Sequence, residues 1–181
     1  MTLHPELQKA MTLTDADRRR IMARVQGITQ MQADYRPAPD AWSVGEVLHH
    51  LILIEVSISK LFNKLIKENQ RMVGATDTRR VEDMQYAAER PQQAPEFGAP
   101  SPGRPVVDLL AELAATRERT KQTLAQYVGA APSELRWKHQ RFGDMGMPHW
   151  ARFIGLHEGH HLQQVERIMA TPEFPQKSAE C

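Results

Sequence analysis

The sequence predicts an all-α protein folded as a four-helix bundle. Apolar residues recur at steps of three and four in four separate stretches, and no series of strands interrupts them. These stretches predict helices over about residues 14–34, 43–69, 106–128 and 148–170. A chain of 181 residues is long enough for one domain with its own hydrophobic core, so we expect residues 1–181 to form a single domain.

The first predicted helix starts at the sequence TDAD (14–17), because threonine and aspartate favour the first turn of a helix. Its apolar positions are Ile21, Val25 and Ile28. The two prolines of the following sequence RPAPD predict that this helix ends near Tyr35.

The second predicted helix has a sharper start. Ser43 and Glu46 stand in the capping-box pattern, in which each side chain accepts a hydrogen bond from the other residue's backbone N–H. Trp42 precedes them in the position of a hydrophobic staple, and we interpret it, like Trp150 in the fourth helix, as a packing residue. The helix has a broad apolar face made by Val44, Val47, Leu48, Leu51, Ile54, Ile58, Leu61 and Leu65.

Residues 71–105 predict a long crossover between the second and third helices. They contain five prolines and three glycines, with a short helical turn expected over 81–89. The segment is too long for a hairpin between antiparallel neighbours, so the second and third helices are predicted to run parallel. Pro148 suits the first turn of the fourth helix. The core positions of the third are Leu109, Leu110, Leu113 and Leu124.

The composition disfavours several classes of partner. Lysine plus arginine number 23 and aspartate plus glutamate 22, and the one basic run, RRR (18–20), is expected on a solvated helix surface, so no nucleic-acid partner is expected. No apolar stretch approaches the roughly 20 residues that cross a bilayer, so no membrane partner is expected. The single cysteine, Cys181, cannot pair within the chain, and the N-terminal residues lack the apolar core of a signal peptide. We therefore expect a soluble, cytoplasmic protein.

Two histidines lie on the core-facing stripe of the predicted fourth helix. His157 and His161 are one helical turn apart and could bind one ion together, whereas His160 points away from them. Each buried imidazole needs a polar partner in an apolar interior, and one shared metal ion satisfies both. The whole stripe is Trp150, Ile154, His157, His161, Val165 and Ile168.

The second helix offers a third imidazole. His49 and His50 are adjacent in an otherwise aliphatic block, and either would complete a three-histidine site with open positions for water or substrate. The helical periodicity does not choose between them, because both lie on apolar stripes.

The sequence HEGHH (157–161) also contains H-E-x-x-H, the motif in which zinc peptidases use the glutamate, here Glu158, to activate water. The longer form of the motif fails, because Gln164 and Arg167 stand where it requires glycine and histidine. No later helix offers a glutamate ligand, so a zinc peptidase is a minor alternative.

Two segments resemble the DinB/YfiT-like superfamily of metal-dependent enzymes. WSVGEVLHHL (42–51) is similar to the family's tryptophan, capping segment and histidine ahead of a branched apolar residue. HEGHHLQQ (157–164) is similar to the pattern H-x-x-H-H-x-x-Q of the family's last helix. The resemblance implies a four-helix bundle of up-down-down-up topology, and a homodimer is expected because family members are often dimeric.

The resemblance also implies a site. The family's divalent ion, commonly nickel or zinc, is held by one histidine of the second helix and two of the fourth, which here are His50, His157 and His161. Gln164 lies one turn beyond His161 and is expected to support the ligands or bind substrate. Glu158 is not required by the family pattern, but it could approach the open side of the ion as a general base.

Characterised members of the family include transferases that add low-molecular-weight thiols to electrophiles. The resemblance therefore implies a metal-dependent thiol S-transferase or hydrolase, which acts on a small-molecule electrophile or hydrolysable substrate. A metal ion lowers the pKa of a thiol or water that it binds. The alternative is a non-catalytic metal-binding bundle, in which the metal only stabilises the fold or a dimer.

Overall fold

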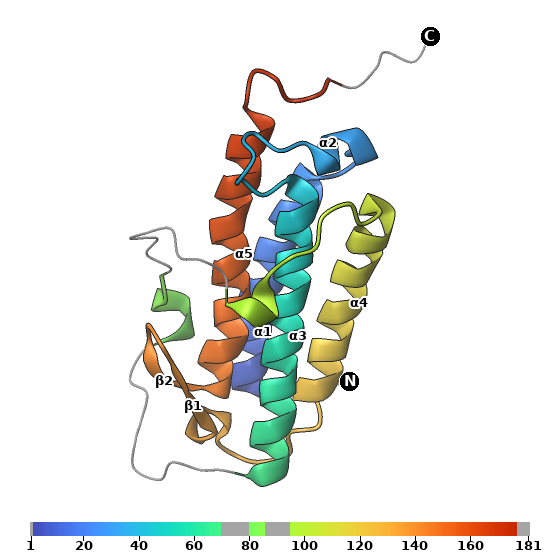
Figure 1. The fold of residues 1–181 in the computed structure, drawn as a ribbon. Coiled ribbons are helices and arrows are strands. Elements are labelled where there is room, and N and C mark those ends of the chain that lie inside the picture. Colours follow the sequence, from blue (N-terminus) through green and yellow to red (C-terminus); the bar gives the residue numbers. More distant parts are fainter. Residues whose placement is uncertain (1, 70–79, 86–94, 177–181) are drawn as a thin grey trace.

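The structure of the protein is a computed structural model that describes residues 2–69, 80–85 and 95–176. Four long helices form a bundle, namely α1 (Pro5–Arg24), α3 (Val44–Glu68), α4 (Val106–Leu124) and α5 (Met147–Met169). Figure 1 shows that α1 and α5 run in one direction while α3 and α4 run in the other. The predicted four-helix bundle of up-down-down-up topology is thereby confirmed. None of the described helices is long and apolar enough to cross a membrane.

The start of the first helix differs from the prediction. α1 begins at Pro5 rather than at Thr14, and Nδ1 of His4 accepts a hydrogen bond from the backbone N–H of Glu6 at 3.3 Å. Thr14 lies within the helix, where its hydroxyl donates to the carbonyl of Ala151 on α5 at 2.9 Å. The predicted start is therefore wrong. Threonine is a common helix-capping residue, but here the Thr14 hydroxyl is hydrogen-bonded to another helix and Thr14 lies inside α1.

The end of the first helix differs as well, since the helix predicted over 14–34 is two helices. α1 ends at Arg24, and Gly27 takes a left-handed φ of 66°, which an α-helix does not include. The short helix α2 (Gln30–Asp34) then begins, because Thr29 and Gln32 form a capping box of their own.

The helix α3 starts as predicted. The hydroxyl of Ser43 accepts a hydrogen bond from the N–H of Glu46 at 3.2 Å, and the Glu46 carboxylate accepts one from the N–H of Ser43 at 2.9 Å. These two bonds confirm the capping box. The helix stops at Asn69, whose φ of 46° is left-handed.

The crossover contains two short 3₁₀ turns in its described part. η1 (Val81–Asp83) falls within the turn expected over 81–89, of which residues 86–89 lie outside the described residues. η2 (Glu96–Gly98) lies against α3. The described end of the crossover therefore contacts the helix that precedes the crossover in the chain.

A hairpin that the sequence did not predict joins α4 to α5. After η3 (Pro132–Glu134), β1 (Arg136–His139) pairs with β2 (Gly143–Gly146) in antiparallel register. Gly143 supplies a left-handed φ of 69° at the end of the turn. The strands RWKH and GDMG show no alternation of apolar and polar residues, which is the usual signal for a strand.

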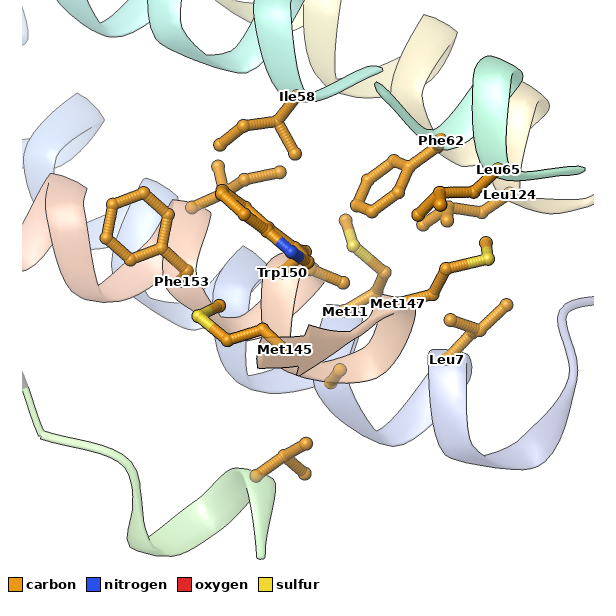
Figure 2. Close-up of a cluster of buried hydrophobic side chains, with 14 of the residues drawn as sticks. Leu7, Met11, Ile58, Phe62, Leu65, Leu124, Met145, Met147, Trp150 and Phe153 are labelled. Carbon is orange, nitrogen blue, oxygen red and sulfur yellow. The ribbon is translucent and has the colours of Figure 1, made fainter. Parts of the chain in front are cut away.

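The core is divided along the bundle by a layer of buried polar side chains. One apolar cluster, drawn in Figure 2, includes Phe62, Met147 and Trp150, so Trp150 has the packing role predicted for it. The other includes Val44 and Leu48. Between the two clusters lies a polar belt to which all four long helices contribute, formed by Thr14, Arg18, His50, Glu55, Thr116, Arg117, Thr120, His157, Glu158 and His161.

Candidate metal centre

Three histidines from two helices converge in the polar belt. Nε2 of His157 lies 3.3 Å from Nε2 of His50 and 3.2 Å from Nε2 of His161. One ring nitrogen from each histidine lies within 4.8 Å of the other two, and all three side chains are buried. The spacing of one helical turn between His157 and His161 places both rings on the face of α5 that meets His50 on α3.

Hydrogen bonds at the other ring nitrogen orient two of these histidines. Nδ1 of His50 lies 2.6 Å from the carbonyl oxygen of Gly98, and Nδ1 of His161 lies 2.8 Å from Oε1 of Gln164. Both oxygens only accept hydrogen bonds, so both Nδ1 atoms carry the proton. In a neutral imidazole the lone pair is then on Nε2, which faces the other two rings.

This arrangement of donors fits a metal ion. The Nε2 lone pairs of His50 and His161 both face Nε2 of His157, which has at most one hydrogen to offer them. Hydrogen bonding within the cluster therefore leaves a buried lone pair unmatched, whereas one cation satisfies all three nitrogens. Zinc–nitrogen bonds of about 2.0–2.1 Å in tetrahedral geometry place neighbouring nitrogens about 3.3 Å apart. The two Nε2 separations match that spacing.

Burial keeps the three imidazoles neutral. It lowers the pKa of His50, holds the pKa of His157 well below its ordinary value, and lowers the pKa of His161 to about 3. Neighbouring histidines add to the effect at His157 and His161. Since only the neutral imidazole binds a metal, the cluster is ready to do so at neutral pH.

Aromatic side chains flank the histidines. The ring of Trp42 lies 5.0 Å from that of His50 and is stacked at 6.4 Å from that of His161. The ring of Phe153 lies 5.7 Å from that of His157. Trp42 is half-buried and packs against the second apolar cluster, so it combines the predicted packing role with a position beside the cluster.

The two adjacent histidines of α3 have different environments. His50 joins the cluster, whereas Nδ1 of His49 accepts a hydrogen bond from the backbone N–H of Ser101 at 2.9 Å. Within the part of the chain that the structure describes, the group able to hold a metal consists of His50, His157 and His161. Contacts between helices therefore make the choice that helical periodicity left open, because His50 meets His157 on α5 and His49 meets the crossover.

Glu158 has a different set of partners. Its Oε1 accepts hydrogen bonds from Nε of Arg18 at 2.9 Å and from Nη2 of Arg117 at 2.8 Å, and both arginines also bind Glu55. These four residues form a buried ion network to which each long helix contributes one member. Burial raises the pKa of Glu158, although the two guanidinium groups act in the opposite direction. Both guanidinium groups bind Oε1, whereas Oε2 is buried without a hydrogen-bond partner among the described residues, so the roles of general base and peptidase glutamate stay predictions.

The other members of the ion network, Arg18, Glu55 and Arg117, were not predicted from the sequence. Glu55 is visible as a single acid in the apolar run LILIEVSIS (51–59), and that isolated charge was an available signal. Arg18 was expected on a solvated surface with the rest of the run 18–20, but it is 7% exposed. Its partners lie on other helices, which the local sequence does not reveal.

A four-helix bundle of this topology with a buried three-histidine cluster defines a DinB-like protein with a candidate metal site. The chain belongs to the DinB superfamily, whose family model matches residues 13–165, and this confirms the resemblance. The uncharacterized protein YuaE of Bacillus subtilis (strain 168) is 25% identical over 152 residues, which cover 80% of this chain and 87% of YuaE.

A solved structure supports the fold. The crystal structure of TT2238, a four-helix bundle protein, matches with a TM-score of 0.59 and 18% sequence identity. The match covers 89% of this chain and 98% of TT2238. The shared architecture therefore extends over nearly the whole chain.

Proposed function

We propose that the protein is a metal-dependent enzyme, a thiol S-transferase or a hydrolase, in which His50, His157 and His161 bind one nickel or zinc ion. The observation that supports this most strongly is the convergence of three buried imidazoles, in which Nε2 of His157 lies at the spacing of metal ligands from Nε2 of His50 and of His161. Such an ion, held by three neutral ligands, keeps its double charge and lowers the pKa of a thiol or water that it binds.

The residues around the cluster have supporting roles in this proposal. The carbonyl of Gly98 and the amide of Gln164 hold the rings of His50 and His161 in orientation. The half-buried ring of Trp42 limits the access of water, which strengthens electrostatic interactions at the site. The proposed substrates are a small-molecule electrophile and a low-molecular-weight thiol, and the proposed assembly is a homodimer.

Turnover assays with and without metal test this function. Protein loaded with nickel or zinc is assayed with a panel of low-molecular-weight thiols and chlorodinitrobenzene, and in parallel with nitrophenyl esters. The proposal predicts turnover that chelation abolishes, that His157→Ala loses, and that His160→Ala retains. His160 is the matched control because it is adjacent to His161 but outside the cluster. Turnover that survives both chelation and His157→Ala would show that the histidines do not carry the chemistry.

The burial of the site favours one second candidate, a non-catalytic bundle stabilised by its metal. His50 is 3% exposed, and His157 and His161 are each 8% exposed, which is typical of a structural metal site. Thermal unfolding with and without chelator, measured beside the turnover assays, separates the two candidates. A large fall in Tm on chelation with no turnover on any substrate of the panel favours the structural role.

A further inference from the structure

The described end of the crossover lies against the two adjacent histidines of α3 and bonds to both. η2 is closed by a hydrogen bond from the N–H of Gly98 to the carbonyl of Pro95 at 2.8 Å. Gly98 then offers its own carbonyl to Nδ1 of His50 at 2.6 Å. Three residues later, the N–H of Ser101 donates to Nδ1 of His49 at 2.9 Å. One short segment therefore contacts Nδ1 of both imidazoles.

Nδ1 donates in the first hydrogen bond and accepts in the second, so the two bonds have opposite sense and select opposite tautomers of the two histidines. A carbonyl oxygen only accepts, which requires the proton of His50 on Nδ1 and leaves its lone pair on Nε2. A backbone N–H only donates, which requires a lone pair on Nδ1 of His49 and places that residue's proton on Nε2. Of the two neighbours, only His50 therefore presents an Nε2 lone pair.

The position of this carbonyl favours a glycine. A Cβ on residue 98 would lie 2.9 Å from Cδ1 of Ile54 and 3.3 Å from Cε1 of His50. The first distance is too short for two carbon atoms, and the second is tight. Cδ1 of Ile54 is the end of a flexible side chain and can turn aside, so the contact that a Cβ at residue 98 would disturb is the one with the His50 ring. We expect that contact to displace the ring and lengthen its bond to the carbonyl of Gly98.

We propose that Gly98 is a positioning residue of the site, which fixes His50 in the Nδ1–H tautomer and so directs Nε2 of His50 at His157 and His161. The effect on the tautomer concerns the protein without metal. The effect on metal binding rests on the proposed function. Gly98 comes from the crossover and bonds to His50, so it acts on the cluster through that histidine.

Gly98→Ala tests the proposal, with Gly159→Ala as the matched control. Gly159 lies on α5 between the two other histidines, and a Cβ there meets nothing within 4 Å in the structure. Nitrogen–proton NMR spectra of the histidine side chains in metal-free protein report the tautomer of His50, and Co²⁺ titration reports metal affinity. We expect Gly98→Ala to lose the single Nδ1–H form and to bind Co²⁺ about 10–100-fold more weakly, whereas Gly159→Ala changes neither.

A second substitution separates the effect of Gly98→Ala from a general loss of folding. Ile54→Val removes the Cδ1 atom that the new methyl group would meet at 2.9 Å, so the double variant should regain part of the Co²⁺ affinity. A Gly98→Ala protein with the wild-type tautomer and affinity would overturn the proposal, as would Nε2–H at His50 in the wild type. If the wild type shows the Nδ1–H tautomer but binds no Co²⁺, the proposed function fails while the positioning of His50 stands.

Discussion

Replacing Glu55 by glutamine should destabilise the protein strongly, because Glu55 lies at the centre of the buried ion network. Its carboxylate is 0% exposed and accepts hydrogen bonds from Nη2 of Arg18 at 2.6 Å and from Nε of Arg117 at 2.8 Å. With both carboxyls ionised, Glu55 and Glu158 balance the two guanidinium charges. Glu55→Gln preserves the shape of the side chain but leaves the two guanidinium groups with one fully buried carboxylate, Glu158, and with Asp15, which is 25% exposed and lies 2.9 Å from Arg117.

The loss in free energy of unfolding follows from the removal of this buried carboxylate. Removing one partner of a buried ion pair typically costs about 3–5 kcal/mol, because the remaining charge is left without compensation. A domain of this length is usually stable by about 5–15 kcal/mol. Since 1 kcal/mol shifts Tm by about 2–4 °C in a domain of 150–250 residues, we expect Glu55→Gln to lower Tm by about 6–20 °C.

Thermal and urea unfolding of metal-free protein at pH 7 measure this effect. The matched control is Glu118→Gln, which removes an acid that is 66% exposed and lies 3.3 Å from Lys121. An exposed pair of this kind contributes about 0–1 kcal/mol. If Glu55→Gln unfolds within about 1 kcal/mol of the wild type, the polar belt does not hold compensated buried charges and the reasoning is wrong.

The remaining predictions concern the histidine cluster. Gln164→Ala removes the acceptor from Nδ1 of His161 and should weaken Co²⁺ binding about 10-fold or more, whereas the exposed neighbour Gln163 can be changed to alanine without effect. Equal affinities of the two variants would contradict this. Co²⁺ should also quench tryptophan emission, because Trp42 lies 5.0 Å from His50, and Trp42→Phe should remove most of the quenching. Burial lowers the pKa of His161 to about 3 from the ordinary 6.5, so the unfolded state binds more protons between these values. The free energy of unfolding of the metal-free protein should therefore fall as the pH drops from 6.5 toward 3, and urea titrations should show a shallower fall in His161→Ala.

The parts of the fold that local signals determine were predictable. The capping box of Ser43 and Glu46 marks the start of α3, and the bonds that form it involve only those two residues. The spacing of His157 and His161 likewise fixes one shared face of α5 without any knowledge of the other helices. Such features follow from helical geometry, so the sequence is sufficient for them.

The features that depend on distant contacts were not predictable. The hydroxyl of Thr14 resembles a helix cap until Ala151, on another helix, is brought beside it. The difference between His49 and His50 comes from other elements, because His50 meets His157 on α5 while Ser101 and Gly98 of the crossover bond to the two rings with opposite sense. The choice of His50 could therefore be carried over from a family pattern, but its physical cause lies in tertiary structure.

Elemental analysis of metal in purified protein tests the central claim most directly. Wild type and His160→Ala, dialysed against a stoichiometric mixture of nickel and zinc, should each retain one divalent ion per chain. His157→Ala should retain far less, because His157 is the ring that both other histidines face at 3.2 and 3.3 Å. Wild-type protein without a stoichiometric ion, or a His157→Ala protein that retains as much as the wild type, would contradict the assignment of a metal centre.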